Sequence, residues 1–143
     1  MSRRDENGFT LVELMVVLVI IGLAATAVML AMPEPGGSLA AEAERFAARA
    51  KAARDSAIVE ARPVALQVDA GGYVISRRRG GEWLAGPRQT WSEGTQAEAS
   101  GALPGGTRFD STGLAEPMSV ALRRRGREIA VDIGADGSVH VRR

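Results

Sequence analysis

The carboxylate of Glu13 has the most unusual chemical setting in this sequence, because it stands at the start of a long apolar stretch. Residues 14–32 form a run of 19 residues without a charge, broken only by Gly22 and Thr26. As a helix, this run would be about 28 Å long, close to the ~30 Å hydrocarbon core of a bilayer. A carboxylate in lipid costs on the order of 2.5–3.5 kcal/mol, so Glu13 is expected to have a function and a charged partner.

The partner that Glu13 requires could come from processing of the chain itself. No basic residue lies between Phe9 and Met32, but cleavage after Gly8 would make the α-amino group of Phe9 a cation. In one straight helix, Phe9 and Glu13 lie about 6 Å apart along the axis, and a neighbouring subunit shifted along that axis could bring its amine closer. Such a pair is favourable in a low dielectric only with good geometry, so it would set the register of stacked subunits.

The apolar stretch has three interpretations: a buried core helix, a secretory signal peptide and a retained membrane anchor. A run of 19 uncharged residues argues against a core helix. Ala25-Thr26-Ala27 is a small-x-small site, and Arg3 and Arg4 could be a basic n-region, which supports a signal peptide. The segment is long for a signal peptide and begins with an acid. We therefore favour the anchor, preceded by a processing site.

A motif at the start of this stretch resembles the class III signal of type IV prepilins. It consists of Gly8-Phe9-Thr10-Leu11-Val12-Glu13-Leu14 followed by the apolar helix. In that family, a prepilin peptidase cuts after the glycine and N-methylates the new phenylalanine, and the glutamate supports assembly into a helical filament. The resemblance implies cleavage between Gly8 and Phe9, N-methylation of Phe9 and filament assembly through Glu13.

The chain after the anchor begins with a break and continues as an amphipathic helix. Residues 33–37 contain two prolines and two glycines, which should end or bend the first helix. Ser38 is a suitable N-cap for a second helix over residues 38–62. Small and apolar residues form a stripe at helical spacing: Leu39, Ala43, Phe46, Ala50, Ala53 and Ala57. The stripe could contact another helix in a filament, but for Phe46 and Ile58 we favour packing on the domain's own sheet.

Residues 63–143 change to the period of two that is typical of strands. Alternation and turn signals occur at 64–68, 118–122, 129–133 and 136–137. The pattern predicts six or seven short antiparallel strands. Residues 86–106 are polar and rich in glycine, with Trp91 the only large apolar residue before Leu103, and are predicted to be a long surface loop.

The layout as a whole resembles the pilin fold, an α+β architecture in which a long N-terminal helix packs on an antiparallel β domain. The helix has a hydrophobic half and an amphipathic half with a Pro/Gly break. The resemblance divides the chain into a leader peptide 1–8, a transmembrane and assembly helix 9–32, a break 33–37, an amphipathic helix 38–62 and a periplasmic β domain 63–143. Four segments resemble the minor pseudopilin H family of type II secretion: EAERFAARAKAARDSAIVEARP, VALQV, GGEWL and ALPGGTRF.

This resemblance implies a structural minor pseudopilin, not an enzyme, that supports protein export across the outer membrane. The partners it implies are other minor pseudopilins, the major pseudopilin, the inner-membrane assembly platform and the prepilin peptidase. The protein is expected to cross the inner membrane once with its C-terminal domain in the periplasm, and to enter the pseudopilus on assembly. The alternative is a minor pilin of a type IV pilus or of a DNA-uptake filament, because H-like minor pilins have the same layout.

The composition gives little basis for an enzyme or a metal site. The chain has no cysteine, one histidine (His140) and one lysine (Lys51), and His140 is expected to point outward from a strand. We therefore predict no catalytic residue, no cofactor and no metal. Asp132 and Asp136 are predicted to be strand and turn residues rather than calcium ligands.

Arginines gather in three clusters near the predicted strand ends and turns. The clusters are 77–79, 123–125 with Arg127, and 142–143. Together they could form one basic edge, which could be a solvated face, a dock for acidic neighbours or a site of DNA capture. The balance of 18 basic and 17 acidic residues, and the presence of only six aromatic residues, argue against nucleic acid as a partner.

Overall fold

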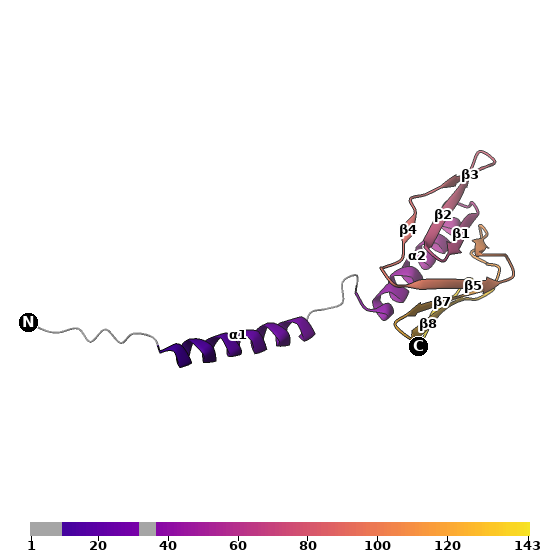
Figure 1. The fold of residues 1–143 in the computed structure, drawn as a ribbon. Coiled ribbons are helices and arrows are strands. Elements are labelled where there is room, and N and C mark those ends of the chain that lie inside the picture. Colours follow the sequence, from indigo (N-terminus) through magenta and orange to yellow (C-terminus); the bar gives the residue numbers. More distant parts are fainter. Residues whose placement is uncertain (1–9, 32–36) are drawn as a thin grey trace, which may run out of the picture. The chain divides into compact units, whose positions relative to one another are not determined.

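The chain forms two compact units, which the computed structural model describes over residues 10–31 and 37–143 (Figure 1). Within the described residues, the N-terminal unit, Met1–Glu34, contains one helix, and the C-terminal unit, Pro35–Arg143, contains one helix and two antiparallel sheets. The helices are α1 (Leu11–Ala31) and α2 (Leu39–Val59). The predicted leader, and the predicted break except for its last residue, lie outside the described residues.

Helix α2 begins where the sequence predicts, with Ser38 as its N-cap. The Ser38 hydroxyl oxygen accepts a hydrogen bond from the backbone N–H of Ala41 at 3.1 Å, which satisfies a free donor of the first turn. All six residues of the predicted stripe are buried within the C-terminal unit, including Phe46. The prediction for Ile58 is wrong in part, because this side chain lies beside Gly113 at the end of the helix and is 41% exposed.

Helix α2 ends at Val59, three residues before the predicted end at Arg62. Ala61 adopts a left-handed conformation with φ = 51°. Its N–H donates to the carbonyl oxygen of Ile58, and the N–H of Arg62 donates to that of Ala57. This is the bonding pattern of a Schellman motif, which normally has glycine at the left-handed position. The sequence therefore did not reveal the helix end.

Nine strands occur among the described residues of the C-terminal unit. They are β1 (Val64–Asp69), β2 (Gly72–Arg79), β3 (Glu82–Ala85), β4 (Gln89–Thr90), β5 (Gln96–Gly101), β6 (Gly106–Phe109), β7 (Met118–Arg124), β8 (Arg127–Ile133) and β9 (Val139–Arg142). The first sheet has the order β3-β2-β1-β6, with β4 also paired to β2. The second has the order β5-β7-β8-β9. All of these pairings are antiparallel.

The core of the C-terminal unit lies between α2 and the two sheets (Figure 1). Helix α2 contacts β1 and β6 of the first sheet and β7, β8 and β9 of the second. The largest fully buried side chains include Phe46, Phe109, Leu66 and Leu122. Every residue of the core cluster belongs to the segment that begins at Leu39 and ends at Val139. A fragment that starts at Gly37 therefore contains the complete core.

The prediction of a surface loop over residues 86–106 is wrong, because this segment contains β4 and β5. Strand β5 pairs with β7 along its whole length and forms an edge of the second sheet. The apolar side chains that it packs against the core are only those of Ala97 and Ala99. Their small size makes the alternation too weak to identify a strand from the sequence.

Trp91, which the sequence placed in that loop, is buried in an aromatic cluster. Its ring centroid lies 5.4 Å from that of Phe46 and 5.0 Å from that of Tyr73. Its indole N–H donates to the backbone carbonyl of Asp69 at 3.0 Å. The indole thus buries its apolar surface and still satisfies its donor. Burial also raises the pKa of the Tyr73 phenol.

Candidate functional site

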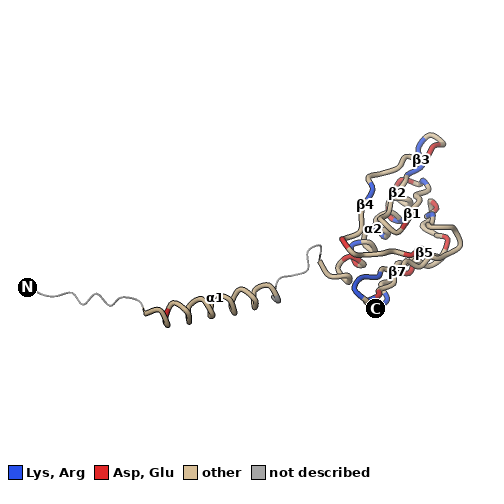
Figure 2. Tube along the Cα trace, in the orientation of Figure 1, with Lys and Arg blue, Asp and Glu red and all other residues tan. Residues whose placement is uncertain are grey.

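The first turn of α1 positions Glu13, the residue to which the sequence analysis assigns a function. Thr10 precedes the helix, and its hydroxyl oxygen accepts a hydrogen bond from the backbone N–H of Glu13 at 3.2 Å. The Thr10 carbonyl accepts another from the N–H of Leu14 at 3.2 Å. Thr10 and Glu13 have the spacing of a capping box, and a carboxylate in the first turn is stabilised by the helix dipole. Figure 2 shows an acidic residue at this end of α1 and no charge along the rest of it.

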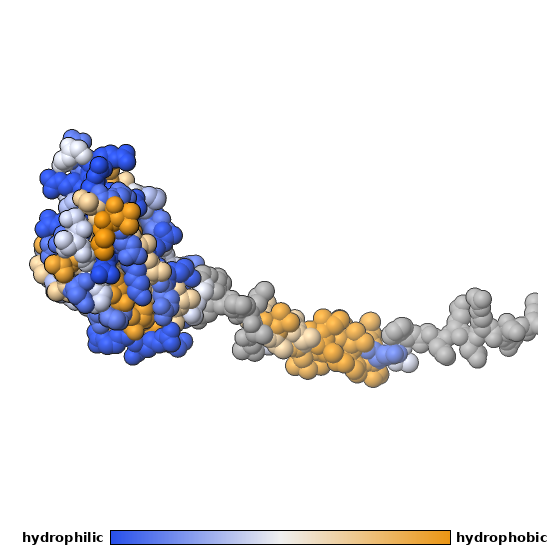
Figure 3. Space-filling model, turned by 180° about the vertical axis from the view of Figure 1, so that it is seen from behind, coloured by the Kyte–Doolittle hydropathy of each residue, from blue (hydrophilic) through white to orange (hydrophobic). Residues whose placement is uncertain are grey.

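The surface of α1 is apolar along the helix rather than on one face (Figure 3). Its segment Leu11–Met29 is long and apolar enough to cross a membrane, and none of it is buried. The helix has 21 residues, which corresponds to a length of about 31 Å. Its one hydroxyl, that of Thr26, donates to the carbonyl of Gly22 at 2.9 Å. The helix therefore satisfies its one hydroxyl internally, as a segment in lipid must, and the carboxylate of Glu13 is the charged group that needs a partner.

The other two predicted site residues, Gly8 and Phe9, lie outside the described residues. Of the three, the structure locates Glu13 alone. Cleavage after Gly8, methylation of Phe9 and pairing of its amine with Glu13 remain predictions.

An ion pair that the sequence analysis missed lies where the chain enters the C-terminal unit. The side chains of Glu42 in α2 and Arg124 in β7 are each 6% exposed, and a guanidinium nitrogen lies 4.0 Å from a carboxylate oxygen. Arg124 also donates to the backbone carbonyl of Gly37 at 2.6 Å. The Glu42 carboxylate accepts from the backbone N–H of Ser92 at 2.6 Å and from the hydroxyl of Thr95 at 2.8 Å. The pair thus joins α2, β7, the β4–β5 connection and the segment leading into the unit.

Two sequence signals could have revealed this pair. Glu42 is three residues after Leu39 and four before Phe46, so it falls on the buried side of the helix. Arg124 follows Leu122 by two residues in the same strand, so both side chains point to the same, buried face. Opposite charges at two inward positions are expected to pair, because a lone buried charge is very costly.

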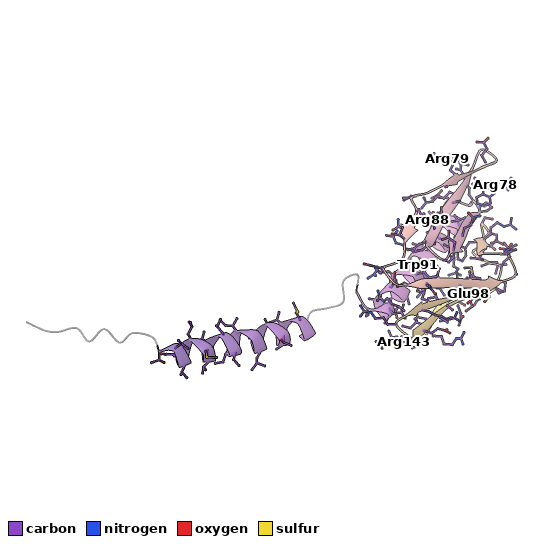
Figure 4. All side chains as sticks on the ribbon, viewed as in Figure 1. Arg78, Arg79, Arg88, Trp91, Glu98 and Arg143 are labelled. Atoms are coloured by element: carbon purple, nitrogen blue, oxygen red, sulfur yellow. The ribbon has the colours of Figure 1, made fainter. Side chains whose placement is uncertain are left out.

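The arginine clusters lie at opposite ends of the C-terminal unit, so they do not form the single basic edge that the sequence left possible (Figure 4). Arg143 pairs with Glu44 near the start of α2, at 3.2 Å. Arg77 donates to the hydroxyl of Ser56 and lies 3.8 Å from the carboxylate of Glu60, near the end of α2. Glu44 and Ser56 are 12 residues apart in α2, so a length of about 18 Å along the helix separates the two groups.

Three other titratable side chains have predicted positions: His140, Asp132 and Asp136. His140 is exposed on β9, as predicted, opposite Asp132 on β8. Asp132 on β8 accepts a hydrogen bond from Arg142, and Asp136 accepts one from the hydroxyl of Ser138 in the turn that precedes β9. Asp132 is therefore a strand residue and Asp136 a turn residue, as predicted. Within the parts of the chain that the structure describes, no three His, Asp or Glu side chains gather where they could hold a metal ion.

We expect Asp132 to make the stability of the C-terminal unit depend on pH. Hydrogen bonds from Arg142, and then from Ser119, hold the pKa of its carboxyl below the usual 3.8. The folded state therefore binds this proton less readily than the unfolded chain. The contribution of Asp132 to the free energy of unfolding is complete above about pH 4 and is lost as the pH falls further.

Thermal unfolding of a fragment that starts at Gly37 tests this expectation. Asp132→Asn should lower the unfolding midpoint at neutral pH, and the difference from the unmodified fragment should shrink towards pH 3. A difference that stays constant over this range would contradict the prediction.

Solved structures place this fold in a known class. The chain is similar to the minor pseudopilin EpsH from the type 2 secretion system of Vibrio cholerae, with a TM-score of 0.61 and 16% identity over 69% of this chain and 91% of that one. It is also similar to the type IV minor pilin FimU of Pseudomonas aeruginosa, with a TM-score of 0.61 and 16% identity over 73% and 88%. The likeness confirms the predicted pilin fold.

Two family models match the sequence of this chain and identify its family. Residues 3–29 match the prokaryotic N-terminal methylation motif, and residues 42–137 match the type II transport protein GspH. The chain therefore belongs to the GspH family. The type II secretion system protein H of Aeromonas hydrophila is 35% identical over 80 residues, which are 54% of this chain. They are 44% of that relative, so the match spans less than half of its length.

Proposed function

We propose that this chain is a non-enzymatic minor pseudopilin, a structural subunit of the pseudopilus of a type II secretion system. The proposal is carried by one combination: a C-terminal unit of the GspH family joined to an apolar helix whose lone carboxylate is capped into the first turn. The fold by itself suits a minor pilin of a type IV pilus or of a DNA-uptake filament equally well. The family match favours secretion over these alternatives.

The proposed maturation follows from the motif at the N-terminus. The prepilin peptidase removes the leader 1–8 and methylates Phe9, and helix 9–32 then anchors the subunit in the inner membrane by a single pass. The C-terminal unit lies in the periplasm. The match of residues 3–29 to the methylation motif supports this sequence of events.

Assembly, in this proposal, moves the helix from lipid into the filament. The Phe9 amine of a neighbouring subunit then neutralises Glu13, which has no other charged residue near it among residues 11–31. The partners are the other minor pseudopilins, the major pseudopilin and the inner-membrane assembly platform. Membership of the family of the type II transport protein GspH supports these partners.

The mass of the N-terminal peptide of the mature protein tests the proposal directly. We expect N-methylated Phe9 as the first residue of protein purified from the native host. A start near Val28 would identify the product of ordinary signal peptidase, and retention of residues 1–8 would mean that the prepilin pathway does not process this chain. Either of these results would refute the proposed assembly.

A further inference from the structure

One end of the C-terminal unit carries an unbalanced group of arginines. Four of them line a shallow pocket of about 230 Å³ at the β2–β3 hairpin: Arg62, Arg77, Arg78 and Arg79. Two carboxylates lie in the same region, Glu60 in the pocket wall and Glu82 opposite Arg79 in the β2–β3 ladder. We call these arginines, together with Trp83 and Leu84, the hairpin surface. It lies at the end of α2 that is opposite Gly37, as the positions of Arg78, Arg79 and Arg143 in Figure 4 illustrate.

The other arginine clusters are largely neutralised within the unit. Arg123 pairs with two glutamates, Glu98 and Glu128, and Arg142 pairs with Asp132 at 3.0 Å. In the hairpin surface, by contrast, the side chains of Arg62 and Arg79 make no ion pair or hydrogen bond with a described residue. Positive charge is therefore available at this end of the unit for an external group.

Apolar side chains lie on both faces of the β3 edge, with Leu84 on the face of Arg77 and Arg79 and Trp83 on the opposite face with Arg78. Trp83 is 42% exposed and Leu84 is 50% exposed. The guanidinium of Arg78 lies over the Trp83 ring, 5.9 Å from its centroid, which holds the arginine in place before any partner binds. Tryptophan and arginine are the residue types that most often dominate the energy of protein interfaces.

The strand that carries Trp83 and Leu84 is also an edge of its sheet. Strand β3 pairs with β2 on one side and stands at the end of the sheet order. Among the described residues, no strand pairs with its other side, so backbone N–H and C=O groups there are open to an extended segment of another chain.

We propose that the hairpin surface docks an extended acidic segment of a neighbouring filament subunit along the β3 edge. Its carboxylates reach Arg62 and Arg79 on the face of Leu84, and its alternate, apolar side chains cover Trp83 on the opposite face. This inference rests on the proposed function. A pocket this shallow with few charges binds weakly, which suffices when assembly of the helices already holds the partner at high effective concentration. A freely diffusing peptide is expected to bind the same surface with lower affinity.

The composition of the surface favours protein over nucleic acid as the partner. Four guanidiniums face two carboxylates, so few phosphates could be neutralised, and affinity for DNA rises with the number of phosphate contacts. Glu60 and Glu82 would also repel a phosphate backbone. One face of the Trp83 ring is occupied by Arg78 and is closed to a stacked base.

Selection from a random hexapeptide library tests the proposal, with the full chain in detergent micelles as the target. We expect enrichment of peptides in which Asp or Glu alternates with large apolar residues. An enriched peptide should bind Arg79→Glu about tenfold more weakly or worse, and should lose affinity when its acids become Asn or Gln. Arg127→Glu is the matched control, because Arg127 is an exposed hairpin arginine at the other end of the unit.

Three results would overturn the proposal. The first is a selection without acidic enrichment. The second is an equal loss of affinity in Arg79→Glu and Arg127→Glu. The third is tighter binding of a short duplex DNA than of any peptide, together with loss of that DNA binding in Arg79→Glu. The mature N-terminus is unaffected by all of these outcomes, so failure of this inference is distinguishable from failure of the proposed function.

A photo-crosslinking residue at position 84 of the full chain, in assembled filaments, identifies the source of the segment. We expect adducts with a pilin-like subunit at a stretch that contains Asp or Glu, and we expect Arg79→Glu to remove them. Adducts confined to non-subunit proteins would contradict the assignment of the partner.

Discussion

Glu13→Ala should leave cleavage after Gly8 intact and lower incorporation of the subunit into the filament by about tenfold or more. In the proposed filament, the Phe9 amine of the neighbouring subunit would lose its counterion in a low dielectric, and removing one partner of such a pair costs about 3–5 kcal/mol. Even half of this is more than a tenfold change in an equilibrium constant. The measurement is quantitative mass spectrometry of the other pseudopilins that co-purify with the variant from crosslinked membranes.

Two further substitutions separate the charge of Glu13 from its place in the first turn. Glu13→Gln keeps the length of the side chain without the charge, and should assemble as poorly as Glu13→Ala. Glu13→Asp keeps the charge one methylene shorter and should retain part of the assembly. All three variants keep Thr10, whose hydroxyl accepts from the backbone N–H of residue 13, so the start of the helix is preserved. Normal co-purification of Glu13→Ala would contradict the proposed pairing.

Arg124→Ala should destabilise the C-terminal unit by about 3–5 kcal/mol, because it leaves the buried carboxylate of Glu42 without its cation. The carbonyl of Gly37 also loses the donor that lies 2.6 Å away. At roughly 4–8 °C per kcal/mol for a domain of about this size, the unfolding midpoint should fall by more than about 10 °C. Urea and thermal unfolding of a fragment that starts at Gly37 provide the measurement.

Arg142→Ala is the matched control for this change. It removes the same side chain from the same sheet, but its pair with Asp132 is exposed, with 69% of the arginine side chain accessible. Exposed pairs contribute about 0–1 kcal/mol. Similar losses in Arg124→Ala and Arg142→Ala would mean that burial of the Glu42–Arg124 pair does not determine its contribution.

A double variant tests whether Glu42 and Arg124 act as one unit. Glu42→Leu combined with Arg124→Leu removes both charges, and should destabilise the fragment less than the two single changes together, because neither leaves the other charge unpaired. Additive losses would show that the two side chains act independently.

The sequence was most informative where the physical signal is local. The apolar run around α1 and the lone Glu13 lie within a single segment of chain. The stripe of α2 and its Ser38 cap are also short-range features, and the structure has both. Each depends on helix geometry and on the cost of a charge in lipid, which neighbouring residues determine without knowledge of the fold.

The sequence was least informative where a residue's environment comes from distant segments. Strand β5 has polar side chains on one face and small side chains on the other, and only its pairing with β7 defines it as a strand. Trp91 is buried because Phe46 and Tyr73, which are distant from it in the sequence, pack against its ring. The left-handed Ala61 that ends α2 has no glycine to signal it.

The sequence by itself determined that this chain has an apolar helix with one carboxylate at its start, an amphipathic second helix and a strand-rich remainder. Each of these features follows from the order of apolar and charged residues along the chain. Only the tertiary structure decided that Glu42 meets Arg124, and that the arginines divide between the two ends of α2 instead of forming one edge. Charge pairing depends on distances in space between residues of different strands and helices, and a one-dimensional pattern does not contain these distances.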